Sequence, residues 1–290
     1  MNNSSDHIWK PKRKQDATEV QTKHETVRRK TMSILNRLTP ENFFSLSQEM
    51  TSLDIDSDDL LDDVIEIWHS KACTEPHYAE MYATLFSQHF SNGSSHDPNS
   101  VLARKSMLNR CQNEFNKEMV SEVEQEALKL LIKSNQTCKN KKHEAHHCLD
   151  DIRRSKQKYL GNICFIGELF KLDLLTPKIM HSIIETLLNT HDEFSFECAS
   201  RLLSIVGHKL DHDLTSLLMD QYFHRVLEIM FLDTTSKRIR FMLQDVIELR
   251  QNDWEPRRLT GPKTIEEVHY EAQLEDFYLR ERAENLGYHF

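Results

Sequence analysis

Glycine and proline are scarce in this sequence, which holds only 6 Gly and 7 Pro among its 290 residues. Average usage of about 7% Gly and 5% Pro would give roughly three times and twice as many. A sandwich or barrel of many short strands needs both residue types in its turns, so this composition argues against an all-β fold. The glycines form no G-x-G pair, and none precedes Lys-Ser or Lys-Thr, which excludes the Rossmann and P-loop phosphate sites.

Long apolar runs are also absent. Residues 163–166 and 227–232 are among the longest apolar stretches, and they are far shorter than the roughly 20 residues that a membrane-spanning helix needs. The N-terminal region is polar and then basic, without the apolar segment of a signal peptide. The 6 cysteines are therefore expected to be free thiols in a reducing compartment. The sequence predicts a cytoplasmic protein that contacts no membrane.

The net charge of -9 conceals an uneven distribution of charge. Residues 1–40 contain nine Lys and Arg against four Asp and Glu, whereas residues 41–70 contain nine acidic residues and no Lys or Arg. This asymmetry favours separate electropositive and electronegative faces that suit more than one partner. The alternative is an ordinary solvated charged surface.

Apolar residues recur at helical spacing from about residue 24 onward. One predicted helix face contains Leu60, Leu61, Val64, Ile65, Ile67 and Trp68, and another contains Leu214, Leu217, Leu218, Tyr222, Val226 and Met230. No segment alternates convincingly with a period of two. Helices of 15 to 25 residues joined by short loops indicate an all-α fold, and specifically an α-solenoid of stacked antiparallel helix pairs.

Three regions follow from this pattern. Residues 1–23 have almost no large apolar residues and are predicted to form a flexible basic arm that carries Trp9. Residues 24–260 are predicted to form the helical-repeat domain, and residues 261–290 a C-terminal helical extension. Within the domain, residues 137–158 are rich in Lys, Arg and His and are predicted to form an exposed loop.

One motif in that predicted loop is typical of an enzyme, because the stretch from His143 to His147 satisfies H-E-x-x-H. In zinc proteases two such histidines hold the metal and the glutamate acts as the base. Here the motif follows several lysines in a polar segment, and Asp150, Asp151 or Glu168 could only be guessed as a third ligand. A structural metal site with the nearby cysteines would lack C-x-x-C spacing. We therefore predict no enzyme, no metal and no cofactor, and keep a zinc hydrolase as a distant alternative.

Several strings resemble the middle domain of eukaryotic translation initiation factor 4G. They are RRKTMSILNRLTPENF (28–43), LNRCQNEF (108–115), YLGNICFIGELFKLDLLTPKIMH (159–181), ECASRLLSIVGHKLD (197–211), MDQYF (219–223), RIRFMLQDVIELRQNDWEPRR (238–258) and GPKTIEEVHYEA (261–272). They occur in the same order as in the family, and the resemblance runs from about residue 28 to residue 272.

This resemblance implies a crescent of five HEAT-type helix pairs without a catalytic site. It implies a translation initiation scaffold that binds a DEAD-box RNA helicase of the initiation factor 4A class and also RNA, and that promotes helicase activity in mRNA recruitment to the ribosome. The initiation factor 3 complex is left open as a further partner. The alternative is an RNA-binding regulator or competitor without productive helicase and cap coupling.

The cap-binding consensus Y-x-x-x-x-L followed by an apolar residue is not met, because Tyr222 and Leu227 are followed by Glu228. No direct cap-binding-protein motif is found elsewhere. The chain is therefore either a fragment of a longer factor or a short paralogue.

The resemblance also implies helicase-contacting residues. Leu35, Leu38 and Phe43 match family positions, and we expect contact because apolar residues flanking an N-terminal turn can leave an exposed patch. Phe241 matches another such position but lies in an apolar helical run, so we expect it to be buried and to act indirectly. Trp9 belongs to a Trp-x-Pro string that resembles a helicase-docking motif, and it is expected to be either an anchor or an idle residue.

Basic clusters are the candidates for RNA contact, which would be electrostatic and largely independent of sequence. The candidate residues are Arg28, Arg29, Lys30, Lys139, Lys141, Lys142, Arg153, Arg154, Arg257 and Arg258, with Arg37, Lys156 and Lys158 nearby. A solubilising surface is the alternative interpretation of these residues.

Overall fold

The computed structural model describes residues 12–91, 98–117, 139–190, 192–212 and 216–255. Ordered secondary structure in these ranges is helical throughout, without a strand, and this confirms the predicted all-α class. The helices are α1 (Lys12–Arg37), α2 (Phe43–Thr51), α3 (Asp58–Thr74), η1 (Pro76–Tyr78), α4 (Ala79–Ser91), α5 (Pro98–Phe115), α7 (Lys139–Lys171), α8 (Pro177–Asn189), α9 (Glu193–Leu210), α10 (Ser216–Phe231) and α11 (Lys237–Gln251).

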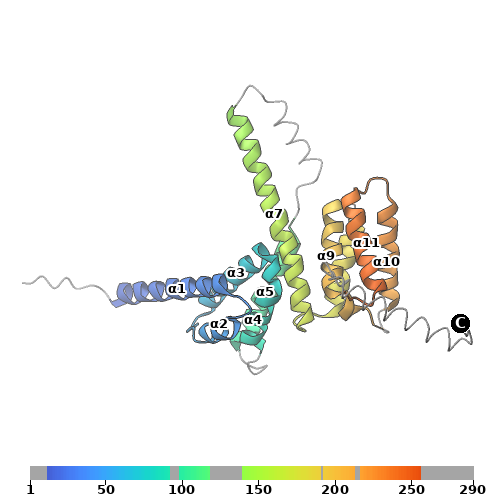
Figure 1. Cartoon of the computed structure of the whole chain (residues 1–290). Coiled ribbons are helices and arrows are strands. Elements are labelled where there is room, and N and C mark those ends of the chain that lie inside the picture. The colour runs from blue at the N-terminus through green and yellow to red at the C-terminus, as the bar shows by residue number, and fades with distance from the viewer. Residues whose placement is uncertain (1–11, 92–97, 118–138, 191, 213–215, 256–290) are drawn as a thin grey trace, which may run out of the picture.

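The described α-helices stack as five consecutive pairs in two layers. The pairs are α1 with α2, α3 with α4, α5 with α7, α8 with α9, and α10 with α11. In one layer α1 packs on α3 and α3 on α5, and in the other α4 packs on α7, α7 on α9 and α9 on α11. Figure 1 shows the first pairs on one side of α7 and the last two pairs on the other. This arrangement is the predicted solenoid.

Local sequence determines where several helices begin. The Ser57 hydroxyl accepts a hydrogen bond from the Leu60 N–H at the start of α3, and the Asp192 carboxylate accepts one from the Ser195 N–H at the start of α9. Pro177 occupies the first turn of α8, where its missing N–H costs nothing. These side chains satisfy donors that a helix leaves unpaired at its N-terminus.

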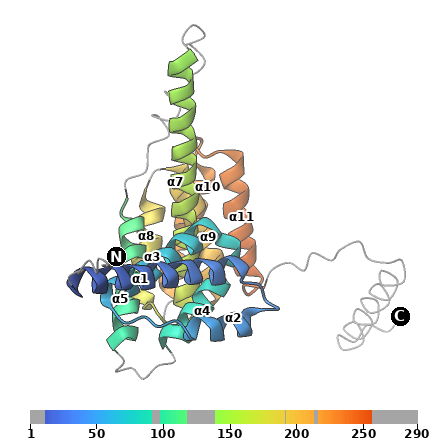
Figure 2. The ribbon, with the colours of Figure 1, turned by 90° about the vertical axis from the view of Figure 1, so that its left-hand side faces the viewer.

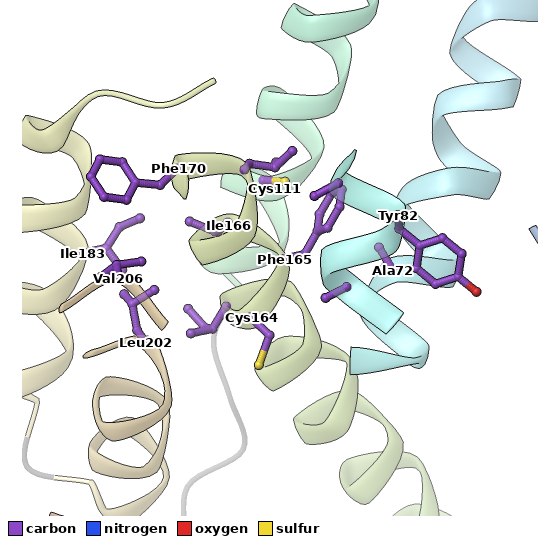
Figure 3. Packing of buried hydrophobic residues seen from close by; sticks show 14 of the residues in the cluster. Ala72, Tyr82, Cys111, Cys164, Phe165, Ile166, Phe170, Ile183, Leu202 and Val206 are labelled. Atoms are coloured by element: carbon purple, nitrogen blue, oxygen red, sulfur yellow. The ribbon is translucent and has the colours of Figure 1, made fainter. Parts of the chain in front are cut away.

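The C-terminal half of α7 lies at the centre of the core. Figure 3 shows Phe165 on the side of Ala72 of α3, whereas Ile166 lies on the side of Leu202 of α9. Close approach to α3 requires Gly161, because a Cβ at that position would lie 1.9 Å from the Cys73 carbonyl oxygen. α7 therefore joins the two halves of the solenoid into one continuous apolar core.

The predicted flexible arm is wrong for residues 12–23, since α1 begins at Lys12. The scarcity of apolar residues in this stretch argues only against burial. Lys, Gln, Ala and Glu are good helix formers, and the stretch continues directly into the buried part of α1, so elongation needs no new nucleus.

The predicted loop over residues 137–158 is also wrong, because residues 139–158 belong to α7. The N-terminal half of this helix projects beyond the packed body (Figures 1 and 2). Its polar composition reflects that solvation, and its Lys, Glu, Ala and Gln residues still favour a helix that the buried half of α7 anchors.

Candidate partner-binding surfaces

The turn between α1 and α2 is held by the side chain of Asn42. Its Oδ1 accepts a hydrogen bond from the Thr39 N–H at 2.7 Å, and its Nδ2 donates to the Arg37 carbonyl at 2.5 Å. The Arg37 guanidinium also pairs with the Glu49 carboxylate at 2.9 Å. These bonds set the orientation of α2 relative to α1 and so decide which residues of the turn reach the surface.

The exposed patch predicted at this turn does not consist of the expected leucines. Leu35 and Leu38 are 1% and 5% exposed and belong to the core, because they continue the inner stripe of α1 that includes Ile34. Phe43 is half-buried and packs against the same core. The most exposed aromatic at the turn is Phe44, at 74%.

Phe44 could have been found from the phase of α2. Leu46 and Met50 are the buried residues of this helix. Phe43 lies three and seven residues before them, on the same stripe, whereas Phe44 lies two and six residues before them, on the opposite face.

The prediction that Phe241 is buried is also wrong, since its side chain is 65% exposed. The buried residues of α11 are Ile239, Leu243 and Val246. Phe241 follows Ile239 by two residues and is therefore rotated by about 200° from it, toward solvent. The exposed Phe241 side chain can therefore contact a partner directly.

Part of the predicted apolar face of α10 is likewise exposed. Leu217 is 71% exposed and Leu218 is 41% exposed, although both were expected in the buried stripe. The stripe that is buried contains Met219, Tyr222, Phe223, Val226 and Ile229. At the other end of α10, Phe231 is 76% exposed.

The Trp254 side chain holds the residues after α11 against the C-terminal end of α9. Asp253 and Trp254 adopt positive φ angles of 51° and 63°, which turns the chain back so that the indole N–H donates to the Asp211 carboxylate at 3.1 Å. A Cβ on Gly207 would lie 2.0 Å from the indole ring, so glycine is required there. Arg250 donates to the same Asp211 carboxylate, and this hydrogen bond raises the pKa of the guanidinium.

The basic and acidic stretches at the N-terminus pair with each other. The Lys23 ammonium lies 2.7 Å from the Asp54 carboxylate, and the Arg28 guanidinium lies 2.9 Å from the Asp63 carboxylate. The hydrogen bond from Arg28 to Asp63 raises the pKa of that guanidinium. The expectation of separate electropositive and electronegative faces is therefore wrong for these residues, because the fold brings both stretches together.

The other basic candidates differ in their surroundings. Arg29 pairs with Glu25 at 2.8 Å, while Lys30 is exposed and forms no ion pair with any described residue. On α7, Arg153 lies 3.9 Å from Asp150 and Arg154 lies 3.4 Å from Asp151. Outside the described residues or side chains are Trp9, Lys139, Lys141, Lys142, Arg257 and Arg258.

One buried cluster contains the residue types of a cysteine hydrolase. The Cys73 Sγ lies 3.4 Å from the His69 Nε2, and the same nitrogen lies 3.0 Å from the Asn162 Oδ1. In a catalytic triad the third residue holds the other ring nitrogen. Burial raises the pKa of Cys73 to about 12 and lowers the pKa of His69, so the reactive thiolate is disfavoured. The cluster is a buried hydrogen-bond network that joins α3 to α7.

The described part of the chain holds no group of three or more His, Cys, Asp or Glu side chains placed to bind a metal ion. Of the two H-E-x-x-H histidines, His143 has its side chain outside that part, whereas His147 is exposed and its Nδ1 lies 2.8 Å from the Asp151 carboxylate. Among the described helices, none is long and apolar enough to cross a membrane.

Comparison with known proteins gives a family and several relatives. The model of the MIF4G domain family matches residues 28–253. Eukaryotic translation initiation factor 4 gamma 1 of Mus musculus is 39% identical over 94% of this chain, and factor 4 gamma 3 of Homo sapiens is 38% identical over 97%. This chain spans 18% of the length of each.

A plant relative and a solved structure complete the comparison. Eukaryotic translation initiation factor 4G of Arabidopsis thaliana is 36% identical over 92% of this chain and 16% of its own length. The crystal structure of the MIF4G domain of Trypanosoma cruzi translation initiation factor EIF4G5 matches 79% of this chain and 97% of that chain, at 20% identity and a TM-score of 0.47.

Proposed function

Since the chain belongs to the MIF4G domain family, we propose that it is a cytoplasmic translation initiation scaffold that binds a DEAD-box RNA helicase of the initiation factor 4A class and RNA. It promotes the ATPase and unwinding activity of that helicase in mRNA recruitment. The observation that carries the proposal is the exposure of Phe241, at a position where the family resemblance implies helicase contact.

The placement of exposed aromatic residues supports a partner with two lobes. Phe44 lies on the first helix pair and Phe241 on the last, at opposite ends of the stack (Figure 1). A large aromatic side chain buries about 150–250 Å² when it is covered, and such residues often dominate interface energetics. Two anchors at the two ends would hold the lobes of one helicase at a defined separation.

We expect RNA phosphates to be contacted by basic side chains that are not already paired with carboxylates of the protein. Lys30 meets this condition among the described residues, and Lys139, Lys141 and Lys142 cluster at the start of the projecting helix α7. On single-stranded RNA each neutralised phosphate should add about 0.7 to the slope of log affinity against log salt. Arg28, Arg153 and Arg154 should add less, because carboxylates already face them.

The test is a binding titration of the purified helicase with nuclease-treated protein. Phe241→Ala should weaken binding at least tenfold, which corresponds to about 1.4 kcal/mol, without lowering the melting temperature. Val101→Ala is the matched control, because Val101 is 55% exposed on α5, a helix that packs on α3, α4 and α7 and carries neither anchor. Retention of the helicase only in the presence of RNA would contradict the scaffold and support the RNA-binding regulator.

A further inference from the structure

The last described helix pair presents apolar side chains where a solenoid normally ends in a polar surface. Leu217, Leu227 and Phe231 of α10 are 71%, 39% and 76% exposed, and Phe241 of α11 is 65% exposed. We name these four residues the terminal face. No described element packs over them, and Figure 1 shows α10 and α11 at one end of the stack.

The four residues share the outer side of the pair. On α10 the three residues lie within an arc of about 80°, opposite the inward-facing Met219 and Val226. α10 and α11 pack side by side, with the Arg240 guanidinium donating to the Leu232 carbonyl at 2.8 Å. The last turn of α10, with Phe231, therefore lies beside the start of α11, where Phe241 is found.

The chain itself supplies a segment suited to cover this face. Residues 256–290 follow the last described residue, and Tyr270, Leu274, Phe277 and Tyr278 recur there at the i, i+4, i+7, i+8 spacing of an amphipathic helix. Thr264 and Glu267 have the spacing of a capping box, which predicts that this helix begins near residue 265.

The connecting chain is long enough. α11 has 15 residues and so measures about 22 Å. Nine residues from Glu255 to Thr264 span up to about 30 Å when extended, so a helix over residues 265–279 can return along the full length of the pair.

The charges also match. Lys237 lies one turn before Phe241, is exposed, and has no ion pair within the described residues. We call residues 256–290 the tail. In the tail, Glu271 and Glu275 lie beside the apolar stripe of the same predicted helix, where a carboxylate can pair with a cation at the edge of the terminal face.

We propose that residues 265–279 dock on the terminal face as an amphipathic helix. Tyr270, Leu274 and Phe277, which span about 10 Å of such a helix, then cover the adjacent Phe231 and Phe241. A consequence that rests on the proposed function is that the docked tail competes with the helicase for Phe241.

Amide hydrogen exchange on the full chain tests the docking without any helicase. Amides of residues 265–279 should exchange at least tenfold more slowly than an unstructured chain. The double variants Leu274→Glu with Phe277→Glu, and Leu217→Gln with Phe231→Gln, should each remove that protection while α7 and α9 stay protected. Val101→Gln, a change of an exposed apolar residue elsewhere, should leave it unchanged. Tail amides that exchange freely in the native chain, or protection that survives both double variants, would overturn the proposal.

Sedimentation separates the tail from a second copy of the chain as the occupant. A monomer whose tail protection is independent of concentration supports the proposal, and a dimer whose protection grows with concentration overturns it. In the helicase titration the tail variant should bind several-fold more tightly. If exchange shows docking but neither the tail variant nor Phe241→Ala alters helicase affinity, the proposed function fails while the docking stands.

Discussion

Among the described helices, the first and the last pair of the solenoid each pack on one neighbouring pair, yet their outer surfaces differ in composition. On α1 the outer surface is largely polar, and its Lys23 and Arg28 pair with acidic residues of the next segments. On α10 and α11 the outer surface carries Phe231 and Phe241. The first pair thus exposes few apolar side chains, of which Phe44 of α2 is the most exposed, whereas the last pair exposes several that a further element or a partner can cover.

The largest effect should come from truncating the buried residues of the first pair. Leu35→Ala should lower the free energy of unfolding by about 2–5 kcal/mol, because it removes a fully buried side chain and leaves a cavity. Phe241→Ala should change it by only about 0.5 kcal/mol, since this side chain is exposed. Urea denaturation of the two variants measures both values. Equal destabilisation would abolish the difference between the two ends.

A second prediction concerns the lock between α9 and the end of α11. Gly207→Ala should destabilise the fold by about 1–3 kcal/mol, because its Cβ would collide with the Trp254 ring. In a Trp254→Ala background the same change should cost much less. A double-mutant cycle measures the coupling. Additive effects would show that the ring does not hold this position.

A third prediction concerns the interior between the two ends. Burial lowers the pKa of His69, His89 and His181. Below the unfolded value of about 6.5, the unfolded chain binds protons that the folded chain does not, so stability should fall as the pH falls through that value toward the lowered folded values. Glu168 opposes this trend, because burial raises its pKa.

Comparison of variants isolates the histidine contribution. The free energy of unfolding of the native chain should decrease between pH 7.5 and pH 5.5, and His69→Gln should flatten this dependence. Asn162, which faces His69, carries no charge in this range, so it contributes none of the slope. An identical pH dependence of the free energy of unfolding in the variant would show that His69 does not contribute to it.

The smallest effect should come from breaking the ion pairs that α1 forms with the segments that follow it. Arg28→Gln should cost roughly 0.2–1 kcal/mol, because the pair with Asp63 is partly solvated, and added salt should reduce the difference. Thermal melting at low and high salt measures it. A loss as large as that of Leu35→Ala would show that charge, and not burial, holds the first pair.

Helical periodicity was sufficient to predict the fold class, and it also located the core of α3. Leu60, Val64, Ile65 and Trp68 are all buried as expected. It failed for residues 12–23 and 139–158, where polar composition was interpreted as an arm and a loop. Composition reports whether a segment is buried, and a polar helix that continues a buried one looks the same as a loop by that measure.

The sequence alone determined the all-α class, the family pattern and the apolar residues available to a partner. It did not show which of those residues reach the surface until the buried stripe of each helix was known, because Leu35 and Phe241 both lie in apolar runs with helical spacing. The buried stripe depends on the rotation of each helix against its neighbours, to which long-range contacts such as Trp254 on Gly207 contribute. Pairing of the basic and acidic stretches was likewise decided by tertiary packing, since it joins residues about 30 positions apart on adjacent elements.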